Sequence, residues 1–167
     1  MKLLFVIIIF AFDLYSPLHQ NPVVIPQDEY YLTSKEKIRY ALFNFDINRD
    51  KYIGFDKNDK PAGLYNLDLI KIERLIDKKI KRHNKETNKV YGNDWIIKSP
   101  EKYFKQFIAV INQKGEKEVW ANCLCEVQTN SWKKYIPVVS DGGTCYFQLK
   151  INLTKGIITS FSVNGVA

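Results

Sequence analysis

The sequence predicts an α+β fold in which one long helix packs across an antiparallel meander sheet of about four to five strands. Residues 66–85 carry apolar side chains at three- and four-residue spacing, which is typical of an amphipathic helix. Residues 104–165 alternate short apolar runs with turns, which is typical of consecutive strands joined by hairpins. Because the helix and the sheet each have an apolar face, the simplest arrangement covers one with the other.

The length and composition suit one domain with a sizeable core. The chain has 167 residues, of which 46% are hydrophobic and 14% aromatic. Its net charge of +7 favours anionic partners, such as lipid head groups or acidic glycans, but does not choose among them.

The N-terminus resembles a leader for export. A single positive charge, Lys2, precedes an unbroken apolar run from Leu3 to Phe12, which is too short to span a bilayer. We therefore predict a signal peptide over residues 1–20 and a single domain over residues 21–167. The mature protein is then periplasmic or secreted and does not span the membrane. Since an exported protein rarely meets DNA or RNA, nucleic acid is not an expected partner.

The segment before the helix has little periodicity. Residues 21–34, with two prolines, form a lead-in, and residues 37–46 (KIRYALFNFD) fit either a short strand or the end of a helix. Residues 47–52 (INRDKY) look like a turn, and residues 53–63 are rich in Gly, Asp, Asn and Pro, as loops are.

The helix over residues 66–85 has recognisable ends. Asn66 is expected as its N-cap, and Asp68 in the first turn complements the helix dipole. Its apolar stripe consists of Leu69, Ile72, Leu75, Ile76 and Ile80. Residues 85–102 are predicted to be a connection in which a short apolar segment, residues 95–97, packs against the core.

Five strands are predicted after this connection: residues 104–112, 117–127, 132–139, 144–153 and 157–165. The strand at 132–139 contains Pro137, so we expect an edge or bulged strand. Asp141 and Gly142 form the Asp-Gly pair of a hairpin turn before the next strand. In that strand Phe147 and Leu149 face one side, whereas Gln148 and Lys150 face the other.

A partial calcium loop lies in FDINRDKYIGFDK. Asp46, Asn48 and Asp50 occupy positions 1, 3 and 5 of such a loop, where a hard cation takes oxygen ligands. Lys51 occupies position 6, where the sharp turn of a calcium loop prefers glycine. Lys57 occupies position 12, where a carboxylate should complete the coordination of the calcium ion. A surface turn is the preferred interpretation, and a calcium-dependent module over Asp46–Asp56 is an alternative.

The three cysteines do not have the spacing of a zinc or redox site. Cys123 and Cys125 form C-x-C on a strand, about 6.6 Å apart along the chain, whereas zinc knuckles and redox pairs use C-x-x-C. A disulfide from one of them to Cys145 suits an exported protein. If the strand at 132–139 lies between them, however, their backbones are about 9.6 Å apart, beyond the roughly 7 Å that a disulfide spans. We therefore expect three small buried thiols.

The other chemistry-bearing residues give no catalytic pattern. The sequence has no G-x-S-x-G elbow, phosphate-binding loop or dinucleotide fingerprint, and no cofactor is expected. Trp120, Trp132 and Tyr135 are candidates for an aromatic binding platform on adjacent strands, although cross-strand core packing explains them as well.

The C-terminal part resembles a known group of sequences. GEKEVWANCLC, WKK, DGGTCYFQLKINLTKG and SVNGVA, together with the helix LDLIKIERLI, resemble in their order a family of small uncharacterised exported proteins from Bacteroidetes-type bacteria. The resemblance covers roughly residues 64–167 and implies no activity. A helix laid across a meander is also the shape of cystatin-like folds, but the cystatin Q-x-V-x-G inhibitory loop is absent, since the corresponding turn reads VQTNSW.

The sequence thus favours an exported binding or interaction protein without catalytic activity. Its expected partner is a protein or an anionic component of the cell envelope. A small hydrolase-type enzyme with an unrecognised carboxylate or cysteine site is the alternative.

Overall fold

The structure is a computed structural model that describes residues 39–91 and 95–165. The predicted signal peptide and lead-in lie outside the described residues. The elements are, in chain order, β1 (Tyr40–Phe43), α1 (Ile47–Asp50), η1 (Lys51–Ile53), β2 (Lys60–Pro61), α2 (Asn66–Tyr91), η3 (Pro100–Lys102), β3 (Phe104–Ile111), β4 (Lys117–Leu124), η4 (Asn130–Lys133), η5 (Gly143–Cys145), β5 (Tyr146–Asn152) and β6 (Ile157–Val163).

The protein is α+β, as predicted, but its sheet is mixed. The strand order is β1-β3-β4-β5-β6, and the short β2 also pairs with β3. Neighbours from β3 to β6 are antiparallel, whereas β1 runs parallel to β3, with Tyr40 opposite Lys105. The prediction of a purely antiparallel meander is therefore wrong. The long crossover through α2 returns the chain in its original direction, which is the connection that parallel strands need.

The predicted strand at residues 132–139 does not exist. The 3-10 helix η4 is followed by irregular backbone as far as η5, and Pro137 lacks the N–H that a sheet ladder needs. Residues 125–145 instead leave the sheet and return, so that β4 pairs directly with β5 and Cys123 lies opposite Phe147.

The helix α2 is longer than predicted and is capped differently. It begins at Asn66 and continues to Tyr91, because neither proline nor glycine interrupts the sequence before Gly92. Asn66 is its first residue and not the N-cap. The carboxylate of Asp68 instead accepts a hydrogen bond from the backbone N–H of Tyr65 (3.1 Å), which is one half of a capping box.

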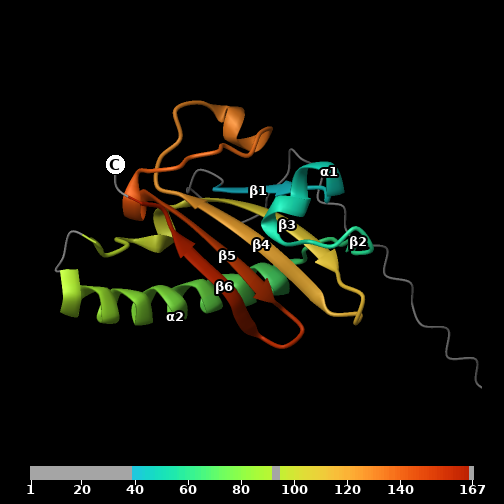
Figure 1. Cartoon of the computed structure of the whole chain (residues 1–167), viewed down its shortest axis with the longest axis horizontal. Helices are drawn as coiled ribbons and strands as arrows, with labels where there is room; N and C mark the ends of the chain where they lie inside the picture. Colours follow the sequence, from blue (N-terminus) through green and yellow to red (C-terminus); the bar gives the residue numbers. More distant parts are fainter. Residues whose placement is uncertain (1–38, 92–94, 166–167) are drawn as a thin grey trace, which may run out of the picture.

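Both faces of the sheet are covered (Figure 1). The predicted packing of the helix on the sheet is confirmed, since Leu69, Ile72, Ile76 and Ile80 share one core cluster with residues of β3, β4 and β5. The second face lies under α1, η1 and the 125–145 segment. Its cluster consists of Ala41, Phe43, Phe55, Ile108, Val110, Trp120, Leu124 and Trp132. This second cover was not predicted.

Candidate functional site

An open groove of about 620 Å³ lies on the sheet face opposite α2. Its floor is formed by polar residues of three neighbouring strands, β4, β5 and β6. One wall is the segment Tyr52–Gly54, and the other is the segment Ile136–Val139. The groove therefore lies where the two irregular covers of this face leave part of the sheet exposed.

Side-chain amides form a continuous row along the sheet, and Asn122 and Gln148 of this row line the groove, whereas Gln106 at its β3 end is fully buried outside it. Gln106, Asn122 and Gln148 are direct cross-strand neighbours on β3, β4 and β5. The amide of Asn122 donates to the carbonyl oxygen of Gln106 (2.8 Å), and that of Gln148 donates to the carbonyl oxygen of Asn122 (3.2 Å). On β6, Ser162 extends the row by donating to the carbonyl oxygen of Gln148 (3.1 Å). Each amide thereby orients the next one.

The same row fastens one wall of the groove. At one end the Gln106 amide donates to the backbone carbonyls of Trp132 and Tyr135, the latter at 2.7 Å. At the other end Asn164 accepts a hydrogen bond from the Gln148 amide (3.3 Å), and its own amide donates to the carbonyl of Val139 (2.6 Å). These contacts tie the irregular segment to the sheet, because they satisfy backbone carbonyls that have no ladder partner.

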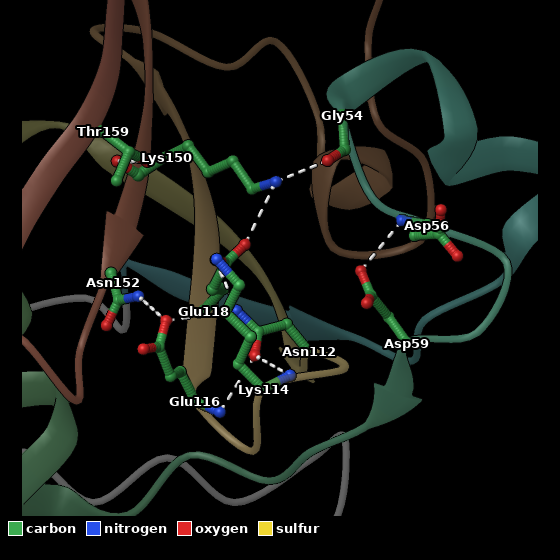
Figure 2. A network of polar contacts seen from close by, with 10 residues as sticks. All are labelled: Gly54, Asp56, Asp59, Asn112, Lys114, Glu116, Glu118, Lys150, Asn152 and Thr159. Atoms are coloured by element: carbon green, nitrogen blue, oxygen red, sulfur yellow. Dashed lines mark hydrogen bonds and ion pairs between the residues drawn. The ribbon is translucent and has the colours of Figure 1, made fainter.

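Lys150 fastens the opposite wall (Figure 2). Its ammonium donates to the carbonyl of Gly54 and forms an ion pair with Glu118 at 3.1 Å. It also lies 4.8 Å from the ring centroid of Phe55. Lys150 is the only charged residue among the described lining residues, and its charge is matched by Glu118. The floor of the groove is therefore polar but close to neutral.

A second polar cluster stabilises the hairpin between β3 and β4 (Figure 2). Glu116 accepts hydrogen bonds from Lys155 (2.7 Å), Asn152 (2.7 Å) and Asn112 (3.4 Å). The bond from Lys155, followed by the bond from Asn152, lowers the pKa of Glu116 to about 2. This carboxylate is thus held ionised by its partners and acts as an anchor for the turn.

The three residues of the partial calcium loop form the turn into α1. The Asp46 carboxylate accepts from the backbone N–H of Asn48 (2.9 Å), as an N-cap does. The buried Asp50 carboxylate accepts from Arg49 (2.5 and 2.8 Å) and from the N–H of Asp46 (2.7 Å). Among residues 39–91 and 95–165 no group of three or more His, Cys, Asp or Glu side chains is placed to hold a metal ion.

Two of the three cysteines form a disulfide. Cys125 and Cys145 are bonded, with their Cα atoms 4.8 Å apart, whereas Cys123 is free and buried. The expectation of three thiols is therefore wrong. It depended on a strand between the two bonded residues, and that strand is absent. Cys123 is fully buried, and this burial raises the pKa of its thiol far above its usual range.

The predicted aromatic residues do not form one exposed platform. Trp120 and Trp132 are buried in the second core cluster, and Trp120 also contributes to the groove lining. Tyr135 is 69% exposed. Together with Trp132 it lines a separate cavity of about 260 Å³, which lies between β4 and the 125–145 segment.

The amide row is the feature that sequence reasoning missed. Alternation in β5 correctly places Gln148 and Lys150 on the face away from the helix. The alignment of Gln148 with Asn122 and Gln106, however, depends on the register of three strands. The one sequence signal for such a row is the presence of polar residues at alternate positions of successive strands. This pattern usually indicates a sheet face exposed to solvent, so it does not predict a row of bonded amides.

The chain matches no protein-family model, and no curated protein or solved structure is significantly similar to it. In the part of the chain that the structure describes, no helix has the length and apolar character needed to cross a membrane.

Proposed function

We propose that the protein is an exported binding protein without catalytic activity, and that its ligand lies in the groove above β4, β5 and β6. The observation that carries the proposal is the row of amides and hydroxyls on the floor of this groove. A concave site with convergent, mutually oriented polar groups is the usual form of a small-ligand site.

The chemistry of the floor favours a neutral glycan of the cell envelope. Amide and hydroxyl groups both donate and accept hydrogen bonds, which matches the hydroxyl groups of a sugar. Tyr52 stands at the rim with 82% of its surface exposed, and its ring offers a stacking face for the apolar side of a sugar. An anionic ligand is less well matched, because Lys150 is already paired with Glu118.

The enzyme alternative has less support. The described residues that line the groove include no carboxylate, and the smaller cavity near the disulfide includes one, Glu126. General acid–base chemistry commonly uses two convergent groups. The only free cysteine, Cys123, is buried with a raised pKa, so it does not fit the role of a nucleophile.

The proposed location is supported by the leader-like N-terminus and by the disulfide, since disulfides persist in oxidising compartments. The resemblance to a Bacteroidetes-type family of exported proteins agrees with this proposed location and remains part of the proposal. The cystatin-like shape remains an analogy of helix and sheet, and it carries no function.

The test is a titration of the purified protein with neutral oligosaccharides from an envelope glycan array. Tyr52→Ala is expected to weaken binding about three- to tenfold by removing the stacking face. Tyr135→Ala is the matched control, because this tyrosine is also exposed but lines the other cavity. Loss of binding in the Tyr135 variant alone, or binding of no neutral glycan by the wild-type protein, would show that the proposed site is wrong.

A further inference from the structure

The strand β6 leaves one edge of the sheet open. It is the last strand in the order, and within the described residues no other strand pairs with its outer edge. Its sequence, IITSFSV, contains neither proline nor a charged residue, which are the usual devices that block an edge. Alternate backbone groups of β6 are therefore available to an added strand.

An apolar groove of about 320 Å³ lies beside this edge, between β6 and α2. Leu75, Ile157 and Ile158 provide its apolar surface, and Ile157 is 48% exposed. A strand added to β6 would direct alternate side chains toward this groove.

The rim of this groove is basic. Lys78, Lys79 and Arg82 on α2 all line it. No ion pair between described residues involves Lys78 or Lys79, and the Lys79 ammonium lies over the ring of Phe161 at 4.7 Å. Arg82 has one carboxylate neighbour, Glu86, at 3.9 Å. The rim thus carries the positive charges of Lys78 and Lys79, which no described carboxylate pairs, and that of Arg82, which Glu86 partly offsets.

We propose that an extended acidic segment of a partner protein adds to the outer edge of β6. Its backbone pairs with the strand, its carboxylates face Lys78, Lys79 and Arg82, and its apolar side chains contact Leu75 and Ile157. Backbone pairing provides affinity in this mode of recognition, whereas the charged rim selects the partner.

The charge of the rim argues against a second copy of this chain as the occupant. Pairing of two β6 edges would bring the basic rims of two α2 helices close together, and like charges across an interface disfavour association.

The test uses two synthetic nine-residue peptides with threonine at the five odd positions. The four even positions, which face α2, are two valines and two glutamates in the first peptide, and two valines and two lysines in the second. Each is titrated into the isotope-labelled full-length mature protein and followed by NMR. We expect the glutamate peptide to shift the amide signals of β6 and of residues 75–82, and the lysine peptide to leave them unchanged. The affinity should fall as salt is added, since the selecting charges are exposed.

Two double variants with the same change in net charge separate the rim from general electrostatics. Lys78→Glu with Arg82→Glu is expected to weaken binding of the glutamate peptide at least about tenfold. Lys85→Glu with Lys89→Glu alters exposed residues of the same helix away from the groove and should have a much smaller effect. All four side chains are exposed, and circular dichroism verifies that both variants are folded.

Several results would overturn the proposal: equal binding of both peptides, equal effects of the two variants, or no shifts at millimolar peptide. Concentration-dependent dimerisation through β6, or binding to phosphatidylglycerol vesicles that the rim variant alone abolishes, would assign the edge to another occupant. The Tyr52→Ala variant should bind the glutamate peptide normally, so failure of the glycan proposal leaves this one intact.

Discussion

At the scale of single residues, the disulfide closes a chain segment that contains little regular structure. Cys125 and Cys145 are separated by 20 positions, and the segment between them covers the second face of the sheet. Because the segment contains only the short 3-10 helices η4 and η5, few regular backbone hydrogen bonds stabilise its conformation. Its covalent closure therefore restricts the unfolded chain and stabilises the native cover.

Replacing both Cys125 and Cys145 with serine is expected to lower the free energy of unfolding by about 3 kcal/mol, the loop-closure value for a loop of about 20 residues. Urea denaturation measures the change. Thiol counting should find no reactive thiol in the native protein and one after unfolding, because Cys123 is free and buried. Three thiols in the unreduced, unfolded protein would contradict the disulfide.

Glu116 predicts a pH dependence of stability. Its pKa falls from 4.5 to about 2 in the folded state, because Lys155 and Asn152 donate to the ionised carboxylate. The stabilising contribution is therefore fully present above about pH 4.5 and is lost as the pH falls toward 2. Glu116→Gln should reduce the fall in the urea midpoint between these pH values. Glu101→Gln is the control, since Glu101 is exposed. Identical pH profiles for wild type and Glu116→Gln would refute the assignment.

At the scale of elements, α2 is positioned by an apolar stripe and by a buried charge. Ile72 and Ile76 are fully buried against the sheet. At the parallel end of the sheet, Lys105 of β3 is 1% exposed and pairs with Glu73 of the helix at 3.1 Å. Glu73 also accepts a hydrogen bond from the hydroxyl of Tyr40 (2.7 Å). One glutamate thus links α2 to both β1 and β3, which sets the position of the helix relative to the sheet.

Ile76→Ala is expected to lower the free energy of unfolding by about 3 kcal/mol, because it removes buried methyl groups and leaves a cavity. Ile70→Ala, on the exposed side of the same helix, should change it by no more than about 0.5 kcal/mol. Urea denaturation of both variants makes the comparison. Similar effects of the two substitutions would mean that the described face of α2 is not the packed one.

At the scale of the whole molecule, export, the disulfide and the open groove form one proposal. Expression of the full chain in a bacterial host with an oxidising periplasm is expected to give a periplasmic or secreted protein that has lost about residues 1–20. Mass spectrometry of this protein should show the loss of two hydrogens from the Cys125–Cys145 bond. Retention of the intact N-terminus in the cytoplasm would contradict the proposed location.

Local patterns were sufficient for the long helix and for four of the strands. The 3.6-residue stripe of α2 and the two-residue alternation of β5 were readable in the sequence, since each element buries one face. The segment 132–139 was misread because its apolar residues, Tyr135, Ile136 and Val138, have the composition of a strand. They cover a sheet face as irregular chain instead, where Gln106 donates to the backbone carbonyl of Tyr135 and Asn164 donates to that of Val139.

The α+β class, the long amphipathic helix, four of the strands and the packing of the helix on the sheet all follow from local sequence patterns. The three-dimensional structure was needed to show that β1 lies parallel to β3, that Cys125 is bonded to Cys145, and that Gln106, Asn122 and Gln148 form one row. The physical reason is the range of the interactions. Periodicity reports which face of an element is buried, whereas strand order and register depend on contacts between residues that are distant in the chain.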